Sequence, residues 1–280
     1  MENPIVWYPG HMAKAKRKMI ECLSLIDIVI ELLDARLPVS SKNPDFESIF
    51  SNKPCITLLT KCTLADDAAT EYWVKKLSED GKPVIPIDCK TKKNFNKIVP
   101  AVRELLKEKL ERYEQKGMNR TIKAMVVGIT NVGKSTFINT FTGKKKAKAE
   151  DRPGVTRANQ WIQSDAGIDF LDTPGVLWHK FDDQMTGVKL ACTGAIKDEI
   201  LDTVELSLKL LDLLREKYPH FITERYKTEP LPDESSYELF ERIARKRGFL
   251  RSGGVIDEER CASVLLDEFR AGKIGKITLD

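Results

Sequence analysis

The sequence predicts an α/β protein whose mostly parallel sheet carries helices on both faces, followed by a small all-helical domain. Over the first 180 residues, short apolar runs alternate with segments of helical periodicity, a pattern typical of such a sheet. A glycine-rich loop between an apolar run and a helical pattern points the same way. After about residue 180 only helical patterns follow. We therefore expect two domains, 1–180 and 181–280, with a boundary near residues 178–188.

The expected strands are runs rich in Ile, Val and Leu, and the expected helices repeat apolar residues every three or four positions. Helix 12–26 is an example, because Met12, Ala15 and Met19 fall on one face. The expected strands are 28–33, 54–59, 84–87, 124–127, 160–163 and 168–171, the last two paired with each other. The other helices expected in the first domain are 66–79, 94–116 and 134–142. Those of the second domain are 187–199, 203–217, 235–247 and 257–271, with breaks at Tyr218–His220 and Pro230–Pro232.

The composition is typical of a soluble globular protein, with 41% hydrophobic and 31% charged residues. No apolar run is long enough to cross a bilayer, and the N-terminus does not resemble a secretory signal. The cysteines are scattered without CxxC spacing, so we expect neither a zinc site nor disulfides, and a cytoplasmic protein with no membrane contact. Several basic clusters favour a nucleic-acid partner, although each alone is explained by a solvated face. The clusters are Lys14–Lys18, Lys144–Lys148 and Arg242–Arg251.

Residues 128–135 match the GxxxxGK[ST] phosphate-loop pattern, after an apolar run and before a helical one. Backbone N–H groups of such a loop surround phosphate oxygens, and the helix N-terminus adds its positive end. Lys134 would reach the β- and γ-phosphates, and Ser135 would hold Mg²⁺. The alternative is a glycine-rich turn that caps an ordinary helix. The expected phosphate-binding residues are Asn131, Val132, Gly133, Lys134, Ser135 and Thr136.

A second phosphate-sensing element is predicted at Asp172–Gly175, a DxxG sequence after a strand. Asp172 would bind Mg²⁺ directly or through its hydration shell, and the Gly175 N–H would sense the γ-phosphate. Pro153 and Thr156 lie between the two elements, and Thr156 is the candidate switch threonine that closes over Mg²⁺. Val176 stands where many GTPases have the glutamine that orients the attacking water. We therefore expect slow hydrolysis unless another group supplies that contact.

Two candidate base-recognition turns precede the phosphate loop, whereas in most GTPases they follow it, so the motif order is circularly permuted. The first turn, Thr60-Lys61-Cys62-Thr63, follows a predicted strand, and Asp88-Cys89-Lys90 follows the next. Lys61 would pack over the base, and Thr60 would replace an asparagine. Thr63 stands where an aspartate would accept two hydrogen bonds from guanine, and losing that charged acceptor would cost about 1.5–3 kcal/mol. The sequence therefore leaves guanine specificity open.

In this order, the motifs resemble the ribosome biogenesis GTPase A family, circularly permuted bacterial GTPases that assist late assembly of the large ribosomal subunit. The resemblance covers nearly the whole chain. Its motifs are Trp7–Ala15, Leu33–Pro38, Ser41–Pro44, Asn131–Ser135, Pro153–Thr156, Asp172–Gly175 and Thr193–Glu199.

The resemblance implies a monomeric GTPase that uses GTP, Mg²⁺ and K⁺, contacts a large-subunit precursor and ribosomal RNA, and is activated by the ribosome. It implies that His11 orients water in catalysis with Lys134 and Thr156; contact of His11 with solvent or RNA is the alternative. It implies that Asn131 binds K⁺ rather than making a simple loop hydrogen bond, and that domain 181–280 contacts RNA. Because of Thr63, two other functions stay open: a ribosome- or RNA-binding module with a degenerate nucleotide site, and an NTPase with relaxed base choice.

Overall fold

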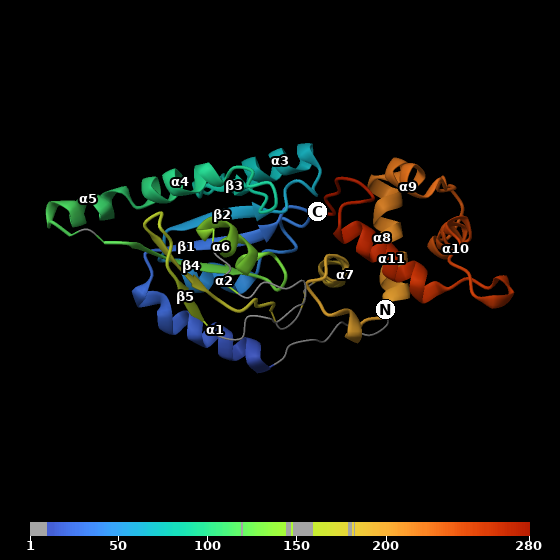
Figure 1. Ribbon diagram of the computed structural model, residues 1–280, viewed down its shortest axis with the longest axis horizontal. Coiled ribbons are helices and arrows are strands. Elements are labelled where there is room, and N and C mark those ends of the chain that lie inside the picture. Colours follow the sequence, from blue (N-terminus) through green and yellow to red (C-terminus); the bar gives the residue numbers. More distant parts are fainter. Residues whose placement is uncertain (1–9, 119, 144–146, 148–158, 179–180, 182) are drawn as a thin grey trace. The chain divides into compact units, whose positions relative to one another are not determined.

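The computed structural model describes residues 10–118, 120–143, 147, 159–178, 181 and 183–280. The chain divides into two compact units, whose described parts lie within residues 6–180, together with Asp280, and within residues 181–279. The first unit holds a six-stranded sheet in its described residues, and the second is built from helices (Figure 1). The α/β fold class predicted from the sequence is confirmed.

The sheet has the order β3-β2-β1-β4-β6-β5, and its strands run parallel except for β5, which is antiparallel to β6. Strand β1 is buried along its whole length, as expected for a parallel sheet covered on both faces. The strands are β1 (Ile28–Asp34), β2 (Cys55–Thr60), β3 (Val84–Pro86), β4 (Ile122–Gly128), β5 (Gln160–Ile162) and β6 (Ile168–Asp172).

The register of the sheet brings the sequence motifs together at the carboxyl ends of the strands. Asp34 at the end of β1 lies opposite Thr60 at the end of β2, and Gly128 at the end of β4 pairs with Leu32. Asp172 ends β6 beside Val126 of β4. Ligands of parallel α/β sheets bind at the carboxyl ends of the strands. The permuted motif order in the sequence therefore still leads to one common site.

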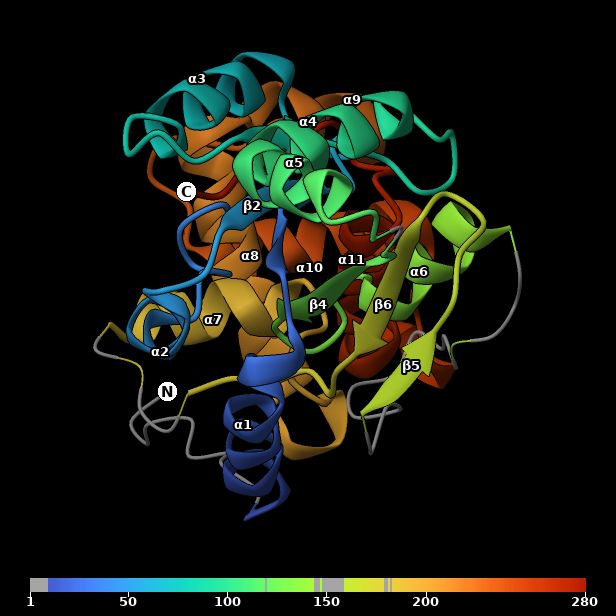
Figure 2. The same cartoon turned by 90° about the vertical axis from the view of Figure 1, so that its left-hand side faces the viewer.

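Helices cover both faces of this sheet: α4 and α5 lie on one side and α1 on the other (Figures 1 and 2). Helix α6 is fixed by an aromatic cluster in which the ring of Phe137 lies 5.8 Å from those of Phe95 and Phe170. The helices of this unit are α1 (Gly10–Cys22), α2 (Pro44–Phe50), α3 (Asp67–Leu77), α4 (Ile98–Leu105), α5 (Lys107–Gln115) and α6 (Lys134–Thr142), with short 3₁₀ turns η1 (Leu23–Leu25) and η2 (Phe95–Lys97).

The structure differs from the sequence prediction at several helices. The single helix expected at 94–116 is interrupted at buried Leu106, whose φ of −105° and ψ of 9° lie outside the helical range. Helix α2 was not predicted, although Asn43 caps it and Pro44 begins it. The helix expected at 187–199 ends at Cys192, because Gly194 takes a φ of 76°. Pro219 begins a helix instead of only breaking one, since its missing N–H costs nothing at the first helical position.

The helical unit is centred on α8, which contacts α7, α9, α10 and α11. Arg270 at the end of α11 donates to the carbonyl oxygens of Ala191 and Cys192 at the end of α7 and pairs with Asp198. Among the described residues no helix is long and apolar enough to span a membrane. The elements are α7 (Gln184–Cys192), η3 (Asp198–Ile200), α8 (Thr203–Lys217), α9 (Pro219–Tyr226), α10 (Ser236–Arg247), η4 (Ser252–Gly254) and α11 (Glu258–Arg270).

Candidate nucleotide site

The phosphate loop connects β4 to α6 as the sequence predicts. Asn131 and Gly133 take φ values of 56° and 103°, and this left-handed backbone lets the loop turn sharply before α6 begins. The Lys134 side chain is buried, and its Nζ donates to the carbonyl oxygens of Gly128 at 3.2 Å and Ile129 at 2.7 Å. Burial lowers the pKa of Lys134 to about 8, although the nearby Asp172 carboxylate acts in the opposite direction.

Asp172 and Ser135 form a set of oxygen ligands suited to Mg²⁺. The Ser135 hydroxyl donates to Asp172 Oδ2 at 3.1 Å, whereas Oδ1 of the same carboxylate is buried with no hydrogen-bond partner among the described residues. Burial raises the pKa of Asp172 above its usual value, although the charge of Lys134 and the hydrogen bond from Ser135 act in the opposite direction. A buried carboxylate oxygen without a donor fits a cation, and hydroxyl and carboxylate oxygens are ligands that Mg²⁺ accepts.

The DxxG segment packs directly against the phosphate loop. A Cβ placed on Gly175 would lie 2.6 Å from Thr130 Cα, so only glycine fits there. Val176 is buried, and its N–H donates to the Gly128 carbonyl oxygen at 3.3 Å. On the other side, Asn43 Nδ2 donates to the Val176 carbonyl oxygen at 3.0 Å. Sequence reasoning assigned no role to Asn43, because its partner lies 133 residues away.

The first base-recognition turn is tied to the phosphate loop through two consecutive residues. The Thr60 hydroxyl donates to the Val132 carbonyl oxygen at 2.8 Å, and Lys61 Nζ donates to the Asn131 carbonyl oxygen at 2.9 Å. Lys61 has a φ of 57°, in the left-handed region. These bonds fix the turn beside the phosphate loop, and the role of Thr60 and Lys61 in binding the base stays a prediction.

A buried ionic cluster behind this turn was not predicted. Asp34 accepts hydrogen bonds from Arg36 Nη2 at 2.8 Å and from Lys61 Nζ at 3.0 Å. Burial alone would raise the pKa of Asp34, but the charges of Arg36 and Lys61 outweigh it and hold the pKa well below its usual range. The sequence feature that could have indicated this cluster is Asp34, a charged residue at the end of an apolar strand. Its carboxylate orients Lys61 toward the phosphate loop.

The second base-recognition turn adds a buried carboxylate. Asp88 accepts a hydrogen bond from the Thr63 hydroxyl at 2.8 Å, so the two candidate turns meet at these residues. Burial raises the pKa of the Cys89 thiol to about 12, and the Cys89 carbonyl oxygen accepts from Thr140 of α6 at 3.5 Å. Lys90 is exposed. The structure thus brings the turns that carry Thr60, Lys61, Asp88 and Cys89 against the phosphate loop and the helix α6 that follows it.

The side chains of three predicted residues are not described. Pro153 and Thr156 lie outside the described residues, and of His11 only the backbone, at the start of α1, is described. Their roles stay predictions. Thr136 lies exposed in the first turn of α6, where its backbone contributes to the helix N-terminus.

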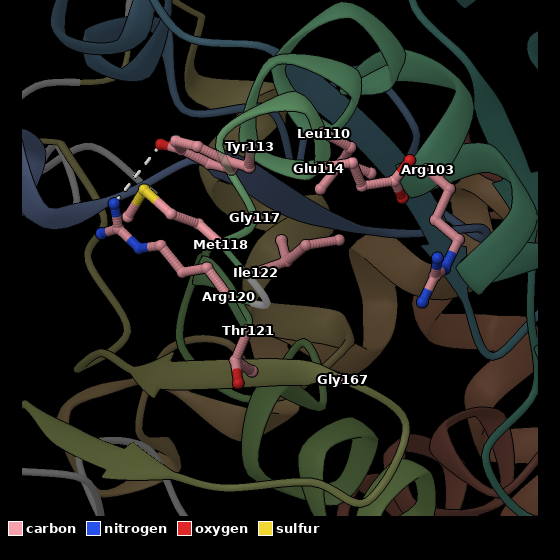
Figure 3. A pocket seen from close by; sticks show the side chains of 10 residues that line it. All are labelled: Arg103, Leu110, Tyr113, Glu114, Gly117, Met118, Arg120, Thr121, Ile122 and Gly167. Carbon is pink, nitrogen blue, oxygen red and sulfur yellow. Dashed lines mark hydrogen bonds between the residues drawn. The ribbon is translucent and has the colours of Figure 1, made fainter.

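A surface hollow of about 410 Å³ lies elsewhere on this unit and is not part of the nucleotide site (Figure 3). It is lined by Ile122, the first residue of β4, whereas the phosphate loop begins at Gly128, the last residue. The two sites are therefore at opposite ends of the strand, about 20 Å apart. In the hollow Arg120 Nη1 donates to Tyr113 Oη at 3.3 Å (Figure 3).

Replacing Asn43 with alanine is expected to destabilise this unit by about 2–4 kcal/mol. The change leaves the buried Val176 carbonyl oxygen without its donor and removes the cap in which Asn43 accepts from the Asp45 N–H at 3.0 Å. Asp66→Ala is the matched control, because Asp66 caps α3 through the Ala69 N–H at 2.7 Å and should cost only about 0.5–2 kcal/mol. Urea denaturation of both variants measures the difference, and equal losses would mean that the bond to Val176 contributes nothing.

The chain is similar to known ribosome-associated GTPases. The 50S ribosome-binding GTPase family profile matches residues 123–230. Ribosome biogenesis GTPase A of Bacillus licheniformis is 46% identical over 277 residues, which cover 99% of this chain and 98% of that protein. The protein of the same name from Priestia megaterium is 48% identical over 278 residues, covering 99% and 96%.

Solved structures agree as well. GNP-bound YlqF from T. maritima superposes with a TM-score of 0.64 at 28% identity, covering 95% of this chain and 97% of that chain. A GDP-bound YlqF structure superposes with a TM-score of 0.67 at 27% identity, covering 94% and 98%. With the permuted order of the base and phosphate motifs, these matches show that the chain belongs to the ribosome biogenesis GTPase A family and is a circularly permuted, GTP-hydrolysing P-loop enzyme of ribosome biogenesis.

Proposed function

We propose that the protein is a cytoplasmic, monomeric assembly factor for the large ribosomal subunit, which acts as a GTP-dependent switch on ribosomal RNA. The observation that carries this proposal is the position of the segment 172–176, which is bonded to the phosphate loop on one side and to Asn43 on the other. A change at the γ-phosphate would move this segment. Because it leads within about ten residues into the helical unit, the movement could alter an RNA-binding surface.

The nucleotide chemistry is assigned to the residues that meet at the carboxyl ends of the strands. Lys134 would contact the β- and γ-phosphates, and Ser135, Asp172 and Thr156 would hold Mg²⁺, which neutralises phosphate charge. The amide oxygen of Asn131, on a partly exposed residue of the loop, is a ligand type that K⁺ accepts. Val176 is apolar and buried and cannot orient water, so we assign that role to His11.

The RNA-binding role is assigned to residues 181–280, although the arginine cluster in this unit gives that role little support. All four arginines of the cluster at 242–251 are paired within the unit. The pairs are Arg242 with Glu234 at 2.6 Å, Arg245 with Glu241 at 2.7 Å, Arg247 with Glu268 at 3.5 Å and Arg251 with Asp257 at 2.9 Å. Paired cations contribute less to phosphate binding, because the acidic partner must be displaced. The support for RNA binding therefore comes from the family more than from this cluster.

Phosphate release with and without large-subunit particles, in K⁺ and in Na⁺, tests the proposal. We expect the particles to accelerate GTP hydrolysis, and K⁺ to exceed Na⁺ by about ten-fold or more, since a cation at the position of an arginine finger supplies part of that group's 10³–10⁵-fold effect. Asn131→Ala should remove the preference for K⁺, and His11→Ala should remove the stimulation. Equal rates with and without particles would contradict a ribosome-activated switch.

A second candidate, a ribosome-binding module with relaxed base choice, is favoured by one observation: Thr63 occupies the position of the usual aspartate. Comparing the affinities for GTP, ATP and XTP by calorimetry separates the two. Similar affinities for all three would favour relaxed base choice.

A further inference from the structure

We propose that Thr63 and Asp88 act together as the acceptor that reads the edge of guanine, with the buried Asp88 carboxylate fixing the Thr63 hydroxyl as a hydrogen-bond acceptor. This inference rests on the proposed assignment of the nucleotide site. It assigns to a pair of residues from two different turns the task that a single aspartate performs in most GTPases.

The first step of the argument is position. Thr63 stands three residues after Thr60, whose hydroxyl is bonded to the phosphate loop, and Asp88 comes two residues after the end of β3. The parallel pairing of β2 with β3 brings the two turns together, and Thr63 Oγ1 donates to Asp88 Oδ2 at 2.8 Å. Asp88 is only 4% exposed, whereas Thr63 is partly exposed. The carboxylate therefore supports the hydroxyl from within the protein.

The second step is the direction of the hydrogen bond. Asp88 Oδ1 accepts from the Thr91 N–H at 2.8 Å and from the Thr91 hydroxyl at 2.9 Å. Burial raises the pKa of Asp88, but the hydrogen bonds from Thr91, Thr63 and Lys90 outweigh it and lower the pKa overall. Asp88 is thus ionised at neutral pH and can only accept. The single Thr63 proton is committed to it, so Thr63 Oγ1 has only its lone pairs, and hence only an acceptor, to offer any further partner.

The third step is the base that such a site matches. The edge of guanine presents two donors, the N1–H and the amine at C2, whereas adenine presents an acceptor at N1. Thr63 Oγ1 offers an acceptor only, while the Asp88 carboxylate behind it is already held by hydrogen bonds from Thr63, Thr91 and Lys90. The site selects guanine, and it does so with weaker bonds than a directly exposed carboxylate would make.

Calorimetric titration with GDP, ADP and XDP tests the pair in four variants. Thr63→Val, which keeps the shape and removes the hydroxyl, should weaken GDP binding about ten-fold with little effect on ADP. Thr63→Ser should keep the guanine preference. Asp88→Asn should weaken GDP and strengthen XDP, since the freed Thr63 proton can then be donated to the C2 carbonyl of xanthine. Thr63→Asp combined with Asp88→Asn, which moves the carboxylate to the usual position, should restore GDP affinity to at least that of the unmodified protein.

Asp67→Asn is the matched control, because it removes an equal charge from an exposed residue four positions after Thr63 and should leave base preference unchanged. An unchanged ratio of GDP to ADP affinity in Thr63→Val, with normal thermal unfolding, would overturn the inference and reduce the pair to a brace between two turns. Failure of the site assignment looks different: the unmodified protein would then bind no nucleotide, or Lys134→Ala would leave all nucleotide affinities unaltered.

Discussion

Replacing Lys134 with alanine is expected to abolish GTP turnover while the protein stays folded. We expect the Lys134 ammonium group to contact the nucleotide phosphates, and loss of a comparable donor to developing negative charge costs on the order of 10²–10³-fold in rate. We expect the fold to survive, because among the described residues the buried Lys134 side chain donates only to the loop carbonyl oxygens of Gly128 and Ile129, and burial disfavours its charged form. Phosphate release measures the first effect, and thermal unfolding without nucleotide measures the second.

The control for this prediction is Lys90→Ala, which removes an exposed lysine from the base-recognition side of the site. Its effect should appear in nucleotide affinity and not in the rate at saturating GTP. Turnover by Lys134→Ala within about ten-fold of the unmodified protein would mean that the GxxxxGK[ST] sequence is only a helix-capping turn. Loss of the folded state would instead mean that the bonds to the loop carbonyls stabilise the unit more than the burial of Lys134 costs.

The parts of this protein that the sequence predicts well are those encoded locally. Most strands are short apolar runs, and the phosphate loop is a contiguous motif between a strand and a helix, so both were placed correctly. The helix interrupted at Leu106 was placed less well, because its periodicity continues on both sides of a residue that leaves the helical range. Helix α2 had a readable signal in Asn43 followed by Pro44, which cap and begin it.

The contacts that shape the site were not predictable, because they join residues far apart in the chain. Thr63 and Asp88 are separated by 25 residues and meet only through the β2–β3 pairing. Considered alone, Thr63 indicated a degraded guanine site; the structure gives it a carboxylate partner. The roles of His11, which the family resemblance assigns, and of Thr156, which its place between the two phosphate elements suggests, stay predictions, because the described residues do not include their side chains.

Replacing Gly175 with alanine is expected to reduce both turnover and stability. The added Cβ would lie 2.6 Å from Thr130 Cα and 2.8 Å from Thr130 N, and also 2.9 Å from Lys134 Nζ. Thr130 contributes backbone atoms of the phosphate loop, which cannot rotate away as a flexible side chain could. Overpacking of this kind costs about 1–3 kcal/mol, which corresponds to about 5–150-fold in rate if the loop is displaced from its catalytic position.

Gly81→Ala separates this steric effect from backbone strain. Gly81 has a φ of 74° with open space around its Cβ position, so alanine there should cost about 1–2 kcal/mol of stability without changing turnover. Unfolding measurements and phosphate release on both variants distinguish the cases, and normal turnover by Gly175→Ala would contradict a tight contact between the switch segment and the phosphate loop. Together with Lys134→Ala, which removes turnover but not stability, the three variants separate the chemistry of the loop from its geometry. A switch needs both, because the segment can report the γ-phosphate only if it rests against the loop that binds it.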